Sequence, residues 1–140
     1  MSARHLVIAD PDARERERCE AIVRSIAPEL GDIVVRTAGD GREALALIEQ
    51  RRPALVLAEV LLEGISGLAL LRRLRRSRGA AAPPFIFVTT LARESDRYWG
   101  LRNGAHGYVM KPYEDDLLQA RIREVLVAGH DALPEKLAAL

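Results

Sequence analysis

The chain has 140 residues, of which 49% are hydrophobic and 29% are charged, and its net charge is +1. These values are typical of a single globular domain with a buried core. A net charge so close to zero excludes a strong general attraction to nucleic acid or to an anionic membrane. The one cysteine, Cys19, excludes an internal disulfide, and no apolar run approaches the roughly 20 residues that span a membrane. We therefore expect a cytoplasmic protein that binds neither nucleic acid nor membrane.

In chain order, apolar runs of strand length alternate with segments whose apolar residues recur at helical spacing. The first predicted strand, residues 5–9, precedes a helix that Asp12 could cap. A second strand at residues 33–37 precedes a helix that begins at Asp40. The third run, residues 54–60, is almost wholly apolar, which indicates a strand in the middle of a parallel sheet.

The second half of the chain continues this alternation. Ser66 begins the third predicted helix, and we expect a solvated face from its arginines, which are Arg72, Arg73, Arg75, Arg76 and Arg78. The remaining predicted elements are strands at 85–89 and 107–110 and helices at 93–103 and 114–128. Five βα units predict a doubly wound α/β fold with a five-stranded parallel sheet. We place this domain at residues 1–128 and expect residues 129–140 to form a tail or a short extra helix.

Polar side chains lie at the carboxyl ends of four predicted strands, which is where ligands bind in such folds. These side chains are Asp10 and Asp12 after the first strand, Glu59 at the third, Thr89 and Thr90 at the fourth, and Lys111 after the fifth. Carboxylates, hydroxyls and an amine at one edge of a sheet suit a cation or a phosphoryl group. Asp12 could reach a cation, but we expect it to cap the first helix instead.

Four ordered segments resemble the receiver domain of bacterial two-component response regulators, over about residues 4–128. They are LVIAD at the first strand, PALVLAEVLLEGISGLALLRRLR at the third strand and the helix after it, FIFVTT at the fourth strand and GAHGYVMKP at the fifth. The order and separation of these segments fit the family. The resemblance implies a (βα)5 flavodoxin-like receiver fold and a role in phosphorelay signal transduction.

The resemblance also assigns roles to the residues at the strand ends. Asp10 matches the first of two Mg²⁺-binding acids, whereas Pro11 occupies the second position and supplies no carboxylate. Glu59 stands where the family has its phosphoacceptor aspartate, and the backbone carbonyl of Leu61 matches a third metal ligand. The matching switch residues are the hydroxyl of Thr89, the aromatic ring of Tyr108 and the amine of Lys111. The bond from this lysine to Pro112 matches one that is often cis in the family.

These differences predict altered chemistry. With only Asp10 and Glu59 as carboxylates, we expect weak Mg²⁺ binding at most and no other cofactor. The extra methylene of Glu59 displaces its carboxylate, and in-line phosphoryl transfer depends on positioning and metal ions. We therefore predict a pseudo-receiver without enzymatic activity, in which Glu59 either mimics the phosphorylated state or forms an inert buried pair with Lys111. The alternative is a Mg²⁺-dependent phosphoacceptor with unusual chemistry.

The resemblance implies a partner surface on the fourth helix, the fifth strand and the fifth helix. We expect Tyr98 and Leu101 to lie in the buried stripe of the fourth helix. Trp99 should point outward beside Arg102, and an exposed tryptophan is a common binding hot spot. Tyr108 and Arg121 should lie on the same face. The expected partners are another signalling protein or a second copy of this chain.

Overall fold

The structure, a computed structural model, describes residues 3–127, which contain five strands, six α-helices and one short 3-10 helix. The strands are β1 (Arg4–Ala9), β2 (Ile33–Ala38), β3 (Leu55–Ala58), β4 (Phe85–Thr89) and β5 (Gly107–Met110). The α-helices are α1 (Ala13–Ser25), α2 (Ala27–Leu30), α3 (Gly41–Gln50), α4 (Gly67–Arg78), α5 (Glu94–Arg102) and α6 (Asp115–Leu126). The 3-10 helix η1 (Gly79–Ala81) follows α4. The prediction for residues 129–140 lies outside the described residues.

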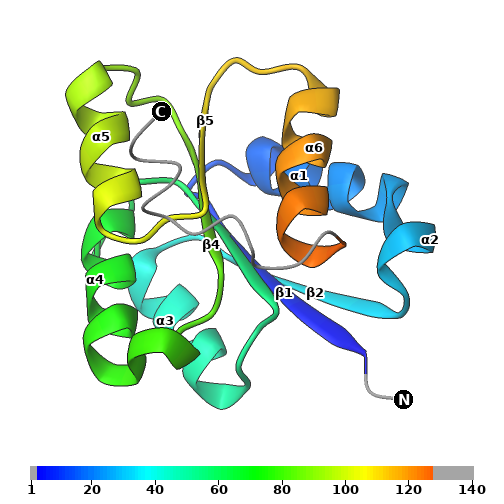
Figure 1. The fold of residues 1–140 in the computed structure, drawn as a ribbon, viewed down its shortest axis with the longest axis horizontal. Coiled ribbons are helices and arrows are strands. Elements are labelled where there is room, and N and C mark those ends of the chain that lie inside the picture. Colours follow the sequence, from blue (N-terminus) through cyan, green and yellow to red (C-terminus); the bar gives the residue numbers. More distant parts are fainter. Residues whose placement is uncertain (1–2, 128–140) are drawn as a thin grey trace.

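All five strands are parallel, and their order in the sheet is β2-β1-β3-β4-β5. This order confirms the predicted doubly wound fold. The chain first moves from β1 to β2 at one edge and then crosses to β3 on the other side of β1 (Figure 1). In such folds a ligand site lies where the strand order reverses, outside the carboxyl ends of the strands. In this chain that place is between β1 and β3.

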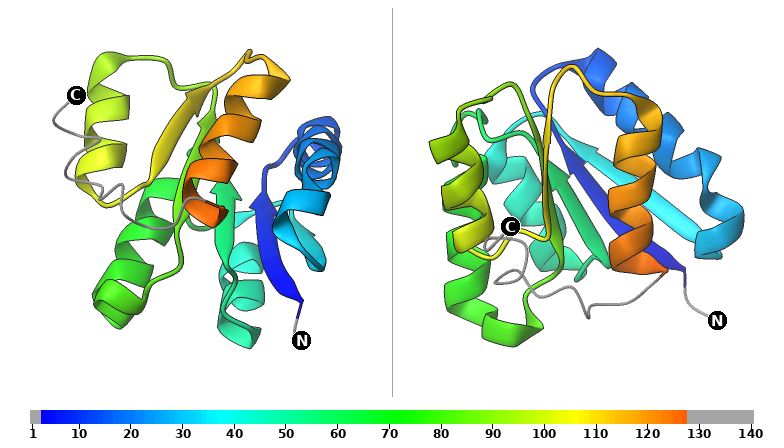
Figure 2. Two further views of the ribbon diagram at one scale, coloured as in Figure 1. Left: turned by 45° about the vertical axis from the view of Figure 1, so that its right-hand side comes forward. Right: turned by 45° about the horizontal axis from the view of Figure 1, so that its top comes forward.

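Alternating residues of the strands build two cores, one on each face of the sheet. In β4, Ile86 and Val88 pack with α1, α2 and α6, whereas Phe85 and Phe87 pack with α3, α4 and α5. The views in Figures 1 and 2 show these two groups of helices on opposite sides of the sheet. Both faces of β1, β3 and β4 are covered, which explains why these strands are nearly continuous apolar runs.

The helix starts follow the predicted capping residues. The side chains of Asp12, Asp40 and Ser66 each accept a hydrogen bond from a backbone amide in the first turn of α1, α3 and α4. The sequence pattern does not predict the short helix α2, because Pro28 favours the end of the first helix. In the structure Pro28 lies in the first turn of α2, a position that proline tolerates. No helix in residues 3–127 is long and apolar enough to cross a membrane.

Candidate functional site

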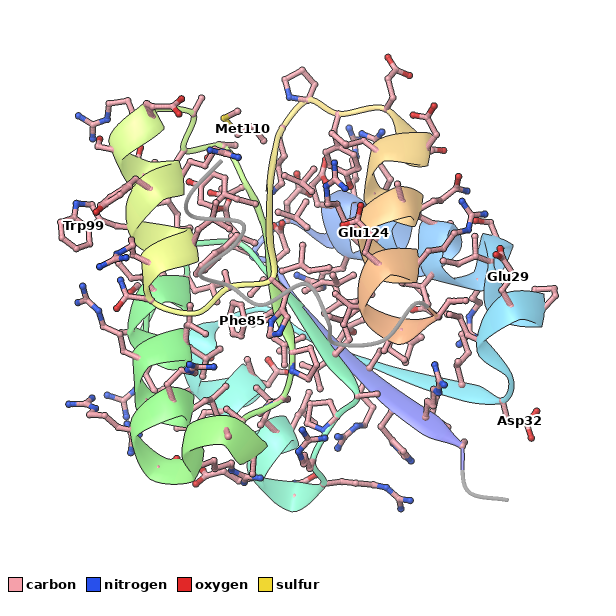
Figure 3. The ribbon with its side chains drawn as sticks, viewed as in Figure 1. Glu29, Asp32, Phe85, Trp99, Met110 and Glu124 are labelled. Carbon is pink, nitrogen blue, oxygen red and sulfur yellow. The ribbon has the colours of Figure 1, made fainter. Side chains whose placement is uncertain are left out.

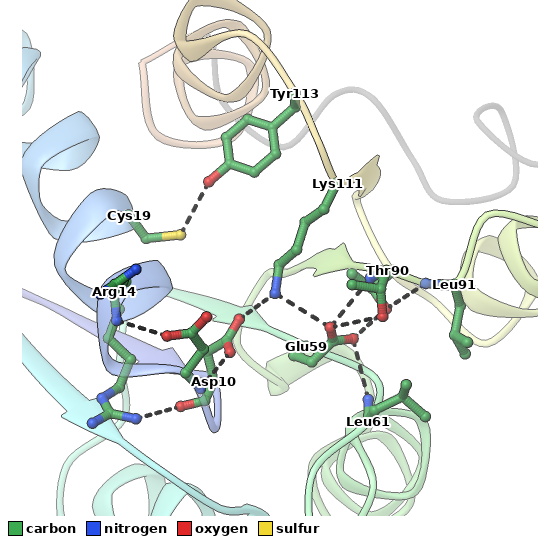
Figure 4. A network of polar contacts seen from close by, with 12 residues as sticks. Asp10, Arg14, Cys19, Glu59, Leu61, Thr90, Leu91, Lys111 and Tyr113 are labelled. Carbon is green, nitrogen blue, oxygen red and sulfur yellow. Dashed lines mark hydrogen bonds and ion pairs between the residues drawn. The ribbon is translucent and has the colours of Figure 1, made fainter.

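Four strand ends bring the predicted polar residues together. Asp10 follows β1, Glu59 follows β3, Thr89 ends β4 and Lys111 follows β5. Because β1, β3 and β4 are adjacent and parallel, these residues meet at one edge of the sheet (Figure 4). The residues Asp10, Glu59 and Thr89 are at most 3% exposed. Buried carboxylates require hydrogen-bond donors or cations, and the site supplies both.

Both carboxylate oxygens of Glu59 accept hydrogen bonds from the protein. Its Oε2 atom accepts a hydrogen bond from the Thr89 hydroxyl and one of 3.2 Å from the backbone amide of Leu61. Its Oε1 atom accepts hydrogen bonds from the amide of Thr90 at 3.2 Å and from the hydroxyl of the same residue at 3.4 Å. The ammonium of Lys111 lies 3.3 Å from Oε1. The two oxygens are thus held by two amides, two hydroxyls and one cation.

Lys111 also binds the second buried acid. Its Nζ atom lies 2.6 Å from Oδ2 of Asp10, whose other oxygen accepts a hydrogen bond of 2.9 Å from the amide of Asp12. The carboxylate of Asp12 itself turns to the helix and accepts a hydrogen bond of 2.9 Å from the amide of Arg14. Asp12 is therefore a helix cap, as predicted. The peptide bond that follows Lys111 is cis, as the resemblance suggested.

These contacts set the protonation states of the two partners. Burial by itself would raise the pKa of Glu59, but hydrogen bonds from Thr89, Leu61 and Thr90 and the charge of Lys111 hold this pKa below its usual value. Burial would lower the pKa of Lys111, but the hydrogen bond and charge of Asp10, followed by those of Glu59, hold it above its usual value. Near neutral pH the site therefore contains a charged carboxylate and a charged ammonium.

The arrangement does not fit Mg²⁺ well. All four carboxylate oxygens of Asp10 and Glu59 already accept hydrogen bonds from the protein. Residues 3–127 contain no group of three or more His, Cys, Asp or Glu side chains that could hold a metal ion. Leu61 contributes its amide to the carboxylate of Glu59. The ammonium of Lys111 bridges the two carboxylates, where a cation would otherwise neutralise them.

The profile of the response regulator receiver domain family matches residues 7–123. The chain is a response regulator receiver domain. Protein PilH from Pseudomonas aeruginosa is 36% identical over 92 residues, which cover 66% of this chain and 76% of that protein. The DNA-binding response regulator MtrA from Mycobacterium tuberculosis H37Rv is 32% identical over 133 residues, which cover 95% of this chain and 55% of that protein. This chain therefore spans about half the length of that relative.

Solved structures agree with this assignment. A CheY-like receiver domain protein from Methanospirillum hungatei JF-1 has 27% identity and a TM-score of 0.77, over 97% of this chain and 99% of that one. The chemotaxis response regulator CheY4 of Vibrio cholerae has 22% identity and a TM-score of 0.76, over 89% of this chain and all of that one. The second likeness concerns the fold alone. Both support the receiver fold predicted from the sequence.

Within this receiver domain, one chain of hydrogen bonds connects Glu59 to Thr89 and Tyr108, two of the predicted switch residues. Thr89 donates its hydroxyl to Glu59 and accepts a hydrogen bond of 3.1 Å from the amide of Leu91. The carbonyl of Leu91 in turn accepts a hydrogen bond of 2.8 Å from the hydroxyl of Tyr108. The ring of Tyr108 packs beside Phe87, with 5.8 Å between ring centroids. Thr89 and the backbone of Leu91 thus connect the acceptor position to Tyr108.

The surroundings of Tyr108 depend on a glycine in α5. A Cβ atom at Gly100 would lie 3.0 Å from the ring of Tyr108 and 3.2 Å from that of Phe87, so α5 approaches both rings closely. The phenol is half-buried, and its burial, followed by the charges of Asp96 and Glu59, raises the pKa of Tyr108 to about 12. Tyr108 is therefore a neutral hydrogen-bond donor at physiological pH.

The predicted partner residues lie on three elements of the receiver domain, α5, β5 and α6. Trp99, of which 54% is exposed, and Tyr108 line a common hollow between α4 and α5. Arg102 is exposed at the end of α5. Arg121 lies on α6, where it pairs with Glu124 of the same helix.

The prediction that Tyr98 is buried is wrong, because 46% of this residue is exposed. Leu101 is buried, as predicted, and Gly100 takes the other buried position of α5. Tyr98 and Trp99 contact each other edge to face, with 5.3 Å between ring centroids. The exposed surface of α5 is therefore more aromatic than the helical pattern predicted.

Two residues, Thr90 and Leu91, contribute hydrogen bonds to the site that the sequence pattern does not predict. The pattern places Thr90 at the strand end but gives it no role, although this residue donates two hydrogen bonds to Glu59. Leu91 acts through its amide and carbonyl, which no side-chain pattern could reveal. The position of Thr90 directly after a predicted parallel strand could have identified it. Backbone amides at such positions point into the site at the sheet edge.

Proposed function

We propose that this chain is an atypical receiver domain, a pseudo-receiver, in which the fixed charge of Glu59 replaces phosphorylation. In this proposal the domain acts as a protein-interaction module of two-component signalling and presents one conformational state to its partners. One observation carries the proposal. The hydroxyl of Thr89, the amides of Leu61 and Thr90 and the ammonium of Lys111 all bind the carboxylate of Glu59.

The donors around Glu59 are the physical basis of this proposal. A phosphoryl group adds strong acceptor oxygens and about two negative charges, so it needs donors and cations in fixed positions. In this receiver domain the longer glutamate side chain carries its oxygens to the Thr89 hydroxyl and the Lys111 ammonium without any added group. Thr89 is then held toward the site, and its link through Leu91 holds Tyr108. The switch residues are thus ordered by the protein alone.

The same geometry argues against phosphotransfer. That reaction depends on metal ions and on an acceptor oxygen that is free to attack in line. Both oxygens of Glu59 already accept hydrogen bonds, and Lys111 bridges Glu59 and Asp10. We therefore propose that the domain needs no Mg²⁺ and is not an enzyme. Its proposed partners are another signalling protein or a second copy of this chain, bound through α5, β5 and α6.

Two measurements on the same proteins test this proposal. The wild type, Glu59→Gln and the control Glu63→Gln are each incubated with acetyl phosphate and Mg²⁺, and their intact masses are recorded. We expect no acid-labile mass increase in any of them. An increase that is present in the wild type and absent in Glu59→Gln would show a working phosphoacceptor instead.

The second measurement is the amide NMR spectrum of the three proteins. Because Gln retains the shape of Glu59 but lacks its charge, we expect the amide signals of Leu91 and Tyr108 to move in Glu59→Gln. The exposed Glu63 lies in the same loop and gives a matched control that should leave both signals in place. Unchanged Leu91 and Tyr108 signals in Glu59→Gln would show an inert buried pair and contradict the proposal.

A further inference from the structure

A groove between α4 and α5 has an apolar end. There, a hollow of about 320 Å³ opens between the two helices, a volume within the range of ligand and side-chain pockets. The apolar residues in its walls are Val60, Leu68, Phe87, Leu91, Trp99 and Tyr108. Trp99 forms the rim, and Figure 3 shows its ring projecting away from the body of the domain. A half-exposed tryptophan beside an apolar hollow is typical of a binding site.

The other end of the groove is basic. A second hollow, of about 440 Å³, is lined by Ala69, Arg72, Arg75, Arg76 and Asn103. Arg72 lines both hollows, and its Nε atom donates a hydrogen bond of 3.1 Å to the side chain of Asn103 at the end of α5. We call these two adjoining hollows the α4–α5 groove. It is apolar near the start of α4 and cationic toward its end.

The arginines of α4 differ from the other arginines of the domain. Six arginines elsewhere in residues 3–127 form ion pairs with acidic side chains. Helix α4 has five arginines and no acidic residue, and none of the five forms an ion pair within the described residues. The whole chain has a net charge of only +1, so the rest of the chain is net negative. The positive charge is therefore concentrated on α4.

Part of this pattern has a local explanation. Basic residues near the carboxyl end of a helix interact favourably with its dipole, which accounts for Arg75, Arg76 and Arg78. Arg72 lies in the middle of α4, and it is a like-charge neighbour of Arg76 at a spacing of four residues, which weakens a helix. An external carboxylate would relieve this repulsion. The unpaired charges beside the groove thus favour an acidic occupant.

Asp96 distinguishes between two kinds of acidic occupant. Its carboxylate lines the apolar hollow, and its Oδ2 atom is buried without a hydrogen-bond donor in the described residues. The nearest cation is the exposed Arg93, with 3.5 Å between Nε and Oδ2. A peptide backbone can offer neutral N–H donors to this oxygen while the acidic side chains of the peptide lie against Arg72 and Arg76. A nucleic acid carries a phosphate at every nucleotide, so it cannot keep its charges away from Asp96 in the same way. The groove therefore favours a polypeptide.

We propose that the α4–α5 groove binds a segment of a partner protein that carries an apolar or aromatic side chain next to two or more carboxylates. The apolar side chain enters the hollow beside Trp99, and the carboxylates pair with Arg72 and Arg76. This groove shares Trp99 of α5 and Tyr108 of β5 with the face formed by α5, β5 and α6, and it extends beyond that face to the arginines of α4. The proposal does not depend on the role of Glu59.

A random dodecapeptide library displayed on phage tests what the groove recognises. The full 140-residue protein is the target, and the double variant Arg72→Glu/Arg76→Glu serves for counter-selection. We expect the enriched peptides to contain an aromatic or large aliphatic residue together with at least two Asp or Glu residues. No enrichment, or enrichment of neutral or basic peptides, would overturn the proposal.

Affinities of an enriched, fluorescently labelled peptide locate the site. We expect Arg72→Glu/Arg76→Glu and Trp99→Ala each to weaken binding about tenfold or more, as loss of a binding hot spot does. The matched control is Arg73→Glu/Arg78→Glu, which makes the same charge change on the side of α4 that faces α3. Equal weakening by this control would show nonspecific attraction and overturn the proposal.

A labelled DNA duplex provides the last comparison. We expect it to bind more weakly than the peptide. Tighter duplex binding that is lost in Arg72→Glu/Arg76→Glu and retained in Trp99→Ala would assign the arginines to nucleic acid and overturn the proposal. Circular dichroism and thermal unfolding of each variant establish that the changes in affinity do not reflect unfolding.

Discussion

The ammonium of Lys111 lies 2.6 Å from Oδ2 of Asp10, closer than its distance of 3.3 Å from Oε1 of Glu59. The lysine that the family resemblance pairs with the acceptor position is thus shared between two buried carboxylates. Two carboxylates this close to one cation would repel each other if the cation were absent. Lys111 is therefore the residue on which the charge balance of the site depends.

Removing this amine should destabilise the domain strongly. We expect Lys111→Met to lower the free energy of unfolding by about 3 kcal/mol or more, because it leaves two buried carboxylates without a cation. Urea unfolding monitored by circular dichroism measures the change. Adding Asp10→Asn to Lys111→Met should recover part of the loss, because only one acid then remains. A loss below about 0.5 kcal/mol, as for ordinary surface changes, would contradict this role.

Magnesium should affect the melting temperature of Lys111→Met but not that of the wild type. In the wild type all four carboxylate oxygens already accept hydrogen bonds, so we expect millimolar Mg²⁺ to leave its melting temperature unchanged. In Lys111→Met the two acids lack a cation, and Mg²⁺ should raise the melting temperature by mass action. Ca²⁺ is the control that shows whether the site prefers Mg²⁺. Added NaCl is the control for the general effect of ionic strength. Stabilisation of the wild type by Mg²⁺ would show that the metal competes with Lys111.

Stability should fall in acid because of Glu59. Its pKa is lowered in the folded protein relative to the value of about 4.3 in an unfolded chain. The unfolded state therefore binds the proton first, and stability falls as the pH drops from about 5 through the folded pKa. Glu59→Gln should have a flatter profile over this range, measured as free energy of unfolding against pH. Parallel profiles for the two proteins would show that Glu59 is not held ionised by its neighbours.

Because of Lys111, we expect the free energy of unfolding to fall as the pH rises in the alkaline range. Its pKa is raised in the folded protein, so its contribution is fully present below the unfolded value of about 10.4 and is lost as the pH rises through the folded value. The same unfolding measurements, extended into alkali, should show this loss. The free energy of unfolding of Lys111→Met should fall less steeply in alkali than that of the wild type, because this variant lacks the amine.

The hydroxyl of Thr89 should matter more than its methyl group. Thr89→Val keeps the shape but removes the donor to Glu59 and the acceptor of the Leu91 amide, so we expect a loss of about 1 to 3 kcal/mol. Thr89→Ser keeps the hydroxyl and should retain the amide NMR signals of Leu91 and Tyr108 near their wild-type positions. Thr89→Val should move both signals. Equal spectra for the two variants would contradict the hydrogen-bonded chain from Glu59 to Tyr108.

The sequence alone predicts the α/β fold, except for the short helix α2, and the sheet edge at which the polar residues gather. Hydrophobic periodicity separates strands from helices, and the capping residues Asp12, Asp40 and Ser66 mark three helix starts. These signals are local, because a cap and an apolar stripe depend on residues a few positions apart. Parallel strands bring their carboxyl ends to one edge of a sheet, so residue order by itself groups Asp10, Glu59 and Lys111 at one site.

Only the tertiary structure decided how these groups divide their contacts. Lys111 is shared between Asp10 and Glu59, and the backbone of Leu91 joins Thr89 to Tyr108; both arrangements depend on distances between separate strands and loops. Helical spacing also failed for Tyr98, because the close approach of Gly100 to the ring of Tyr108 sets which side of α5 is buried. The physical reason is that residue order determines which groups reach the sheet edge, whereas packing between elements determines which donor meets which acceptor.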